Sequence, residues 1–279
     1  MKLLKRIRPL GESLLAGLAC ITVPLLPRAG VVRLAGCLGA MAFHLARRER
    51  RTALANLDVA FGATRTAEEK ERIVRGAFRA FSLVLLDLFW FGRNKKRRIA
   101  KHVSFDPSFD HYLKTAPVIA VTAHLGNWEI MGQAAAQQGA ASLSVATPLA
   151  NRFVDRMLTR LREGTGQGIA EQTGAVRVLL KALREGGKVA LLIDQNTLPD
   201  KGGVFVNLFG TPAPMSKAAA TLSAHTGAAV VFVYCVADEK GDYRAYALPP
   251  LLAPGARGKE EEVTQTIAQS LENVIRKHP

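Results

Sequence analysis

A histidine and a glutamate separated by four residues are the pair in this sequence best suited to acid–base chemistry. They are His124 and Glu129 of the segment HLGNWE. An imidazole titrates near neutral pH and can accept the proton of a hydroxyl group as a general base. A carboxylate beside it would fix the tautomer of the ring and stabilise its protonated form. The spacing alone is weak evidence, so the surrounding elements have to support the assignment.

A second carboxylate, Asp194, directly follows an apolar segment over residues 188–193. In a parallel sheet its side chain would lie at the same edge as His124. An aspartate that only begins a loop fits the pattern equally well. The polar, Gly- and Pro-containing loop 195–203 could then form a mobile lid over the site.

The elements around His124 are typical of a catalytic edge. The apolar, β-branched run 118–122 predicts a buried strand that ends just before the histidine, and a helix is expected over 128–138. A strand end next to a helix start is where α/β folds place their chemistry. Gly126 permits close approach of the backbone, and N–H groups near Gly126 and Asn127 are predicted to bind an oxyanion.

From about residue 102 onward, short apolar segments alternate with amphipathic ones. This alternation predicts an α/β fold with a mixed, largely parallel sheet flanked by helices. Strands are expected near 118–122, 142–146, 188–193, 203–207, 229–235 and 243–248, and helices near 128–138, 151–163, 174–185, 214–226 and 260–277.

The first hundred residues differ in both pattern and charge. Residues 1–101 contain 21 Lys and Arg against 7 Asp and Glu, a net of +14, whereas the whole chain carries +15. A capping box at Thr66 and Glu69 predicts a long helix to about residue 91. We therefore divide the chain into a basic helical region over 1–101 and an α/β core over 102–279, integrated into one domain.

Apolar segments accompany these basic clusters. Residues 10–27 and 29–46 are apolar but interrupted, the first by Glu12, Pro24 and Pro27, whereas a spanning helix needs about 20 clean apolar residues. Basic residues beside apolar helices favour a retained segment that lies in the interface of an anionic membrane. Ordinary core helices are the alternative. No nucleic-acid-binding motif is present, so nucleic acid is not an expected partner.

Other chemistries find little support. There is no G-x-S-x-G motif for a serine hydrolase, and the three cysteines have neither metal nor disulfide spacing, so no metal is predicted. Arg152 and Arg162 could pair with a phosphate, although a solvent-facing helix arginine is the better explanation for each one singly. Phe205 and Phe209 could line an acyl pocket or belong to an ordinary core.

HLGNWE also resembles the signature of the bacterial lipid A biosynthesis (lauroyl/myristoyl) acyltransferase family. Further similarity extends in order over nearly the whole chain. It comprises ALANLDVAFG (53–62), LREGTGQGI (161–169), GGKVALLIDQN with GVFVNLFGTPAP (186–214) and ATLSAHTGAAVVFV (220–233).

The resemblance implies a glycerolipid acyltransferase-like fold with an N-terminal membrane-docking part. It implies transfer of a fatty acyl chain from an acyl carrier protein or coenzyme A thioester to a hydroxyl of a membrane glycolipid, such as a lipid A precursor of lipopolysaccharide. No cofactor beyond the thioester co-substrate is implied. The site would lie at the cytoplasmic face of the inner membrane, in a peripheral or monotopic protein. His124 would be the base, and either Glu129 or Asp194 its carboxylate partner.

Two departures concern the region presumed to meet the acyl chain or the acceptor. The family often has Phe-Phe-Gly where this chain has Leu208-Phe209-Gly210, and a threonine where this chain has Met215. A thioesterase, in which water replaces the alcohol, and a non-catalytic lipid-binding protein are the alternative functions for the same fold.

Overall fold

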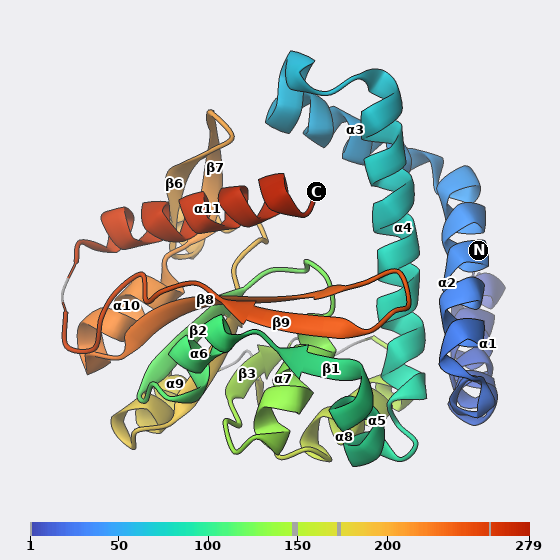
Figure 1. Cartoon of the computed structure of the whole chain (residues 1–279), viewed down its shortest axis with the longest axis horizontal. Helices are drawn as coiled ribbons and strands as arrows, with labels where there is room; N and C mark the ends of the chain where they lie inside the picture. The colour runs from blue at the N-terminus through green and yellow to red at the C-terminus, as the bar shows by residue number, and fades with distance from the viewer. Residues whose placement is uncertain (1, 147–149, 172–173, 257) are drawn as a thin grey trace.

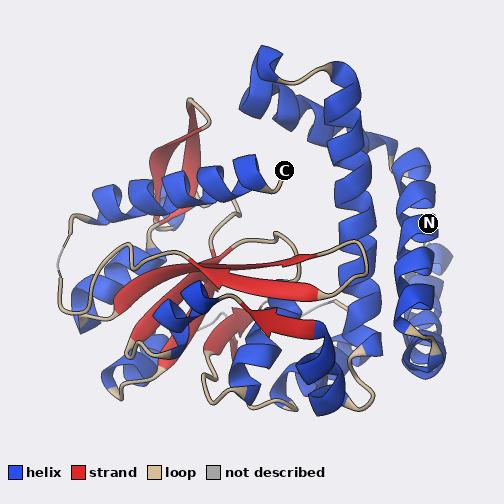
Figure 2. Cartoon of the chain, viewed as in Figure 1, coloured by secondary structure: helices blue, strands red, loops and turns tan. Residues whose placement is uncertain are grey.

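The computed structural model describes residues 2–146, 150–171, 174–256 and 258–279. Its described residues form a seven-stranded sheet with helices on both faces, a separate two-stranded hairpin, and a group of helices along one side (Figures 1 and 2). The strands are β1 (Val103–Phe105), β2 (Val118–Thr122), β3 (Leu143–Ala146), β4 (Gly168–Glu171), β5 (Lys188–Leu192), β6 (Gly203–Leu208), β7 (Thr211–Ser216), β8 (Ala229–Ala237) and β9 (Tyr243–Ala247).

The sheet order is β1-β9-β8-β2-β5-β3-β4. All neighbouring strands are parallel except β8 and β9, which are antiparallel. The predicted mixed, largely parallel sheet is therefore confirmed. The helices are α1 (Lys2–Thr22), α2 (Arg28–Leu45), α3 (Arg47–Phe61), α4 (Ala67–Trp90), α5 (Lys95–His102), α6 (Asp110–Leu113), α7 (Trp128–Gln137), α8 (Arg152–Glu163), α9 (Ala175–Arg184), α10 (Ala218–Thr226) and α11 (Glu260–Lys277).

The central strand β2 is buried along its whole length, because it contributes side chains to two cores. Val118 and Ala120 belong to the core that includes residues of α2, α4 and α7. Ile119 and Val121 belong to the core on the other face, under α9, α10 and α11. Alternation of side chains across a strand explains why a parallel strand covered on both faces is apolar throughout.

The region after β5 differs from the sequence prediction. The strand expected over 203–207 exists as β6, but it pairs with β7 in a hairpin outside the main sheet. The helix expected from residue 214 begins only at Ala218, because Thr211–Ser216 forms β7. Strands β1 and β4 were not predicted. Each has four residues or fewer, so its hydrophobic period gives only a weak signal.

The N-terminal helices α1, α2 and α4 lie side by side at one end of the sheet (Figure 1). The predicted capping box begins α4: the Glu69 N–H donates to Thr66 Oγ1 at 3.2 Å, and the Thr66 N–H donates to Glu69 Oε2 at 2.8 Å. Val31 and Trp90 are buried in the same core as the sheet residues of β8 and β9. The basic region thus packs directly on the α/β core.

A buried ion pair attaches these helices to the sheet. The guanidinium of Arg28 on α2 pairs with both carboxylate oxygens of Asp87 on α4. The phenol of Tyr243 on β9 donates to the same carboxylate at 2.6 Å. Burial raises the pKa of Asp87, against the opposing effect of the hydrogen bonds from Arg28 and Tyr243. Three elements distant in sequence therefore meet at one carboxylate.

Removing this carboxylate should destabilise the protein severely. We expect Asp87→Ala to lower the free energy of unfolding by about 3–5 kcal/mol, because Arg28 would stay buried without a counter-charge. Urea unfolding followed by circular dichroism measures the change. Asp110→Ala is the control, since Asp110 forms only an exposed pair with Lys114. Equal stabilities of the two variants would contradict the anchoring role.

Candidate active site

The structure places His124 and Asp194 in direct contact. Thr122 of β2 is in register with Leu192 of β5. His124 follows Thr122 by two positions, and Asp194 follows Leu192 by two positions. The Asp194 carboxylate accepts the His124 backbone N–H at 3.0 Å and lies 3.0 Å and 3.1 Å from His124 Nδ1. Parallel pairing of two neighbouring strands therefore builds the site.

The contact orients the imidazole. With Nδ1–H donating to Asp194, the other ring nitrogen, Nε2, keeps its lone pair available as a base. Burial raises the pKa of the Asp194 carboxyl, but the hydrogen bonds from the side chain and backbone of His124 outweigh it, so the pKa lies below its usual value. The carboxylate is thus ionised at neutral pH and can stabilise a protonated ring.

The turn after His124 is held against strand β8. Gly126 has φ +62°, and a Cβ there would lie 1.8 Å from the carbonyl oxygen of Cys235. The Asn127 N–H donates to that same carbonyl at 2.9 Å, and Asn127 Oδ1 caps α7 by accepting the Ile130 N–H at 3.0 Å. The Asn127 N–H is therefore occupied by β8 and is not the donor for an oxyanion in this structure. Binding of an oxyanion by the other N–H groups near Gly126 and Asn127 stays a prediction.

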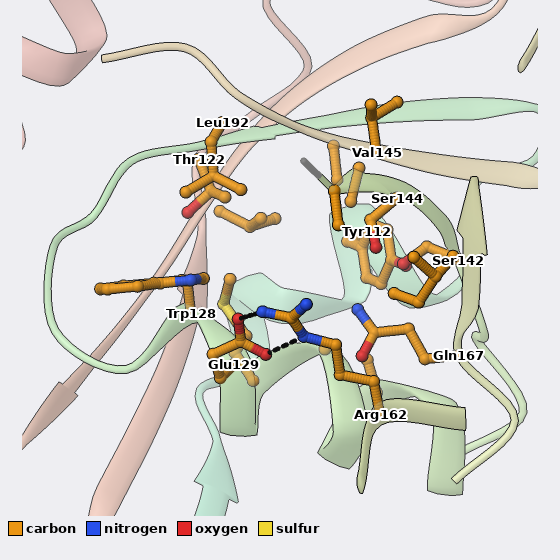
Figure 3. A pocket seen from close by; sticks show the side chains of 18 of the residues that line it. Tyr112, Thr122, Trp128, Glu129, Ser142, Ser144, Val145, Arg162, Gln167 and Leu192 are labelled. Carbon is orange, nitrogen blue, oxygen red and sulfur yellow. Dashed lines mark hydrogen bonds and ion pairs between the residues drawn. The ribbon is translucent and has the colours of Figure 1, made fainter. Parts of the chain in front are cut away.

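Glu129 does not contact His124. Its carboxylate forms a bidentate pair with Arg162 of α8, in which Arg162 Nε donates to Oε2 at 2.8 Å and Nη2 pairs with Oε1 (Figure 3). The pair is largely buried, with side-chain exposures of 12% for Glu129 and 22% for Arg162. Arg162 is therefore neither solvent-facing nor free for a phosphate in this structure. Of the two carboxylates that the sequence offered to His124, Asp194 is the one in contact.

An open groove of about 560 Å³ leads to His124 and Asp194. One wall is α4, which presents the small and apolar residues Gly76, Ala77, Ala80 and Phe81. Leu271 and Ile275 of α11 line it as well. The groove thus joins the polar His124–Asp194 pair to a long apolar surface.

A smaller cavity of about 70 Å³ lies on the α7 side of the sheet. Its apolar lining includes Met131 and Leu192, and the Glu129–Arg162 pair stands at its wall (Figure 3). Two buried polar atoms of its lining residues, Thr122 Oγ1 and Gln167 Oε1, have no hydrogen-bond partner. Trp128 lines both spaces, and its ring contacts His124 edge-on with centroids 4.5 Å apart.

Sequence reasoning missed Trp128 and the α4 wall. Trp128 belongs to the HLGNWE segment, and its place on the first turn of the helix that follows His124 could have indicated that it lies at the site. Residues of α4 are far away in sequence, and nothing local indicates that they face the site. Among the remaining candidates, Arg152 is exposed at the start of α8. Phe205 is 61% exposed on the hairpin.

Phe209 lies outside the groove and the cavity as well. It sits at the hairpin turn with φ +52° and contacts Phe61, the last residue of α3, with ring centroids 5.8 Å apart. The contact of either phenylalanine with an acyl chain stays a prediction. The described residues show no group of three His, Cys, Asp or Glu side chains able to hold a metal ion.

Comparison with known proteins identifies the family of the chain. The model of the family described as bacterial lipid A biosynthesis acyltransferase matches residues 4–279. Two curated phosphatidylinositol mannoside acyltransferases of Mycobacterium tuberculosis, from strains CDC 1551 and H37Rv, are each 28% identical over 161 residues. The match covers 56% of this chain and 49% of each relative, so the matched region spans about half the length of these proteins.

Among solved structures, the 1-acyl-sn-glycerophosphate (LPA) acyltransferase PlsC of Thermotoga maritima is similar at 14% identity with a TM-score of 0.42. The alignment covers 88% of this chain and 98% of that one.

The lowered pKa of Asp194 makes its contribution to stability depend on pH. An unfolded aspartate has a pKa of about 3.9, so the ionised carboxylate stabilises the folded state fully above that value. The contribution is lost as the pH falls through the lower pKa of the folded protein. We therefore expect the difference in unfolding free energy between wild type and Asp194→Asn to shrink in acid.

Urea unfolding of both proteins from neutral to acidic pH measures this difference. Asp200→Asn, which alters an exposed carboxylate of the same loop, is the matched control and should show a smaller pH dependence. A difference for Asp194→Asn that stays constant with pH would contradict the proposed coupling to His124.

Proposed function

Because the chain belongs to the bacterial lipid A biosynthesis acyltransferase family, we propose that it transfers a fatty acyl chain from a thioester to a hydroxyl of a membrane lipid. The observation that carries this proposal is the His124–Asp194 pair at the end of an apolar groove. A base, its orienting carboxylate and an apolar surface are what transfer of an acyl chain to an alcohol requires. The chain is thus an O-acyltransferase in this proposal.

The reaction needs no covalent enzyme intermediate. His124 Nε2 takes the proton of the acceptor hydroxyl while its oxygen attacks the thioester carbonyl carbon. The tetrahedral intermediate collapses, the C–S bond breaks, and the protonated imidazole returns the proton to the leaving thiolate. Asp194 stabilises the imidazolium formed between these steps. Such general-base assistance contributes a rate factor of roughly a hundred to ten thousand.

The donor in our proposal is an acyl carrier protein or coenzyme A thioester, which is a co-substrate rather than a bound cofactor. Its alkyl chain lies against the apolar α4 wall, where Ala77, Ala80 and Phe81 line the groove. The acceptor is a glycolipid such as a lipid A precursor, on the route to lipopolysaccharide. The names of the curated relatives, which act on a mannosylated phosphatidylinositol, support an acceptor of this class.

We further propose that the protein lies on the cytoplasmic face of the bacterial inner membrane. Helix α1 supports this placement, because Leu14, Leu18 and Ile21 project from one of its faces and are 59–74% exposed. Lys and Arg predominate in the same region of the chain, as is typical of helices that rest in an anionic interface.

No single described helix is long and apolar enough to cross a bilayer. The pair Arg28–Leu45 and Arg47–Thr64, bent by 91°, passes the same criteria of length and composition when taken together.

An acyl-transfer assay tests the proposed reaction. Purified protein is supplied with acyl carrier protein or coenzyme A thioesters and a panel of lipid acceptors. We expect His124→Ala to lower the transfer rate roughly a hundredfold to ten-thousandfold. His111→Ala, which removes an exposed histidine of α6, is the matched control. Full activity of His124→Ala would refute the mechanism.

The same assay separates the two carboxylates and the rival functions. We expect Asp194→Asn to lower the rate more than Glu129→Gln does, because only Asp194 contacts the imidazole. Thioester hydrolysis without an acylated lipid would identify a thioesterase. Lipid binding without any turnover of thioesters would identify a non-catalytic lipid-binding protein.

The apolar face of α1 predicts insertion into lipid. Replacing Leu14 and Leu18 by serine should weaken adsorption to phosphatidylcholine vesicles by roughly tenfold or more. The reason is that burial of each leucine side chain in lipid contributes about 1.5–3 kcal/mol to the free energy of binding. Vesicle cosedimentation measures the change. The control replaces Val176 and Val178, exposed apolar residues of α9, by serine. Equal losses for both pairs would argue against an α1 docking face.

A further inference from the structure

A second groove, of about 470 Å³, lies between α2 and α4. Arg33 of α2 and Arg75 and Arg79 of α4 line it, and none of its described lining residues is acidic. Its remaining lining is small or apolar and includes Gly39 and Phe43. We call this surface the arginine groove. None of its residues belongs to the catalytic pair.

The arginines are placed by close helix packing. A Cβ at Gly39 would lie 2.7 Å from the Cα of Arg79, so only glycine allows α2 and α4 to approach this closely here. Arg75 is restrained on two sides, because its guanidinium lies 4.1 Å from the Phe43 ring centroid and donates to Glu71 at 2.6 Å. In the described part of the chain, no carboxylate forms an ion pair with Arg33 or Arg79. The groove therefore keeps an excess of positive charge.

Guanidinium groups match phosphate in geometry as well as charge. Each presents a planar fork of N–H donors that can bind two phosphate oxygens at once, and a guanidinium is more weakly hydrated than an ammonium group. Arg33 and Arg79 have no acidic partner among the described residues, and Arg75 beside them is held in place. This arrangement suits one phosphate group better than an extended polyanion.

The position of the groove indicates where that phosphate comes from. Gly76 of α4 lines both the arginine groove and the groove that leads to His124, which we call the catalytic groove, and a Cβ at Gly76 would meet nothing within 4 Å. Because Gly76 has no side chain, no side chain separates the two grooves at this position. Met41 and Leu45, on the same helix as Arg33, are exposed apolar residues, as expected where a helix borders lipid. A headgroup whose tails remain in the bilayer would reach this site.

We propose that the arginine groove binds the phosphate headgroup of an anionic membrane lipid, on the opposite side of α4 from His124. The inference rests on the proposed function, and it assigns a specific lipid-binding site to three residues of the basic region. The bound lipid would hold α4, and with it the apolar wall of the catalytic groove, at the membrane surface.

Vesicle binding of the full chain tests the proposal. The variant is Arg33→Gln with Arg79→Gln, and the vesicles are phosphatidylcholine alone or phosphatidylcholine mixed with phosphatidylglycerol. We expect roughly a tenfold or larger loss of binding to the mixed vesicles, given the contribution of each basic residue close to an anionic surface, and little change with phosphatidylcholine alone. Both arginines are exposed, and circular dichroism of the variant should match wild type.

The control removes the same charge elsewhere. Arg177→Gln with Arg184→Gln alters two exposed arginines of α9 and should retain binding to the mixed vesicles. Equal losses of vesicle binding in the two double variants would show that binding depends on the overall charge of the protein, and would overturn the proposed lipid site. Lost binding to acyl carrier protein with unchanged vesicle binding would overturn it in favour of a protein partner. Absence of acyl transfer by the unaltered protein would refute the proposed function instead, because vesicle binding is read without any turnover.

Discussion

The register between β2 and β5 is the constraint on which the site depends. Because Thr122 pairs with Leu192, the residues that follow at equal distance, His124 and Asp194, emerge side by side at the carboxyl edge of the sheet. A shift of one residue in either strand would turn the alternating side chains of that strand to the opposite face. Burial of β2 between two cores prevents such a shift, since its side chains are matched to both faces.

A second constraint fixes what surrounds this edge. Helix α4 forms a wall of the groove at Gly76, Ala77 and Ala80, yet it belongs to the N-terminal helical region. Its position relative to the sheet is set by Asp87, which binds Arg28 of α2 and Tyr243 of β9. Tyr243 also lines the catalytic groove. Placement of the basic helices and shape of the groove are therefore consequences of the same buried contact.

The two acidic residues of the site have separate physical roles. Asp194 acts on the imidazole directly, whereas Glu129 neutralises Arg162 at the wall of the inner cavity. Trp128 contacts the imidazole edge-on and lines both the groove and the cavity. One short segment after β2 thus supplies the proposed base, a tryptophan that lines both spaces and one half of a buried ion pair. The neighbouring Gly126 and Asn127 hold the segment against Cys235.

Local pattern was sufficient to determine most of the alternation of strands and helices after residue 102, the buried strand 118–122, the capping box at Thr66 and the presence of His124 at a strand end. These features depend on contacts within a few residues, or on a hydrophobic period that a single strand or helix displays. The order of strands, the pairing of His124 with Asp194 rather than Glu129, and the α4 wall depend on contacts between segments far apart in sequence. The hydrophobic period of a single strand or helix carries no information about these contacts. Tertiary packing alone decided that Glu129, the carboxylate nearer in sequence, pairs with Arg162. It likewise decided that Asp194, 70 residues away in the chain, contacts His124.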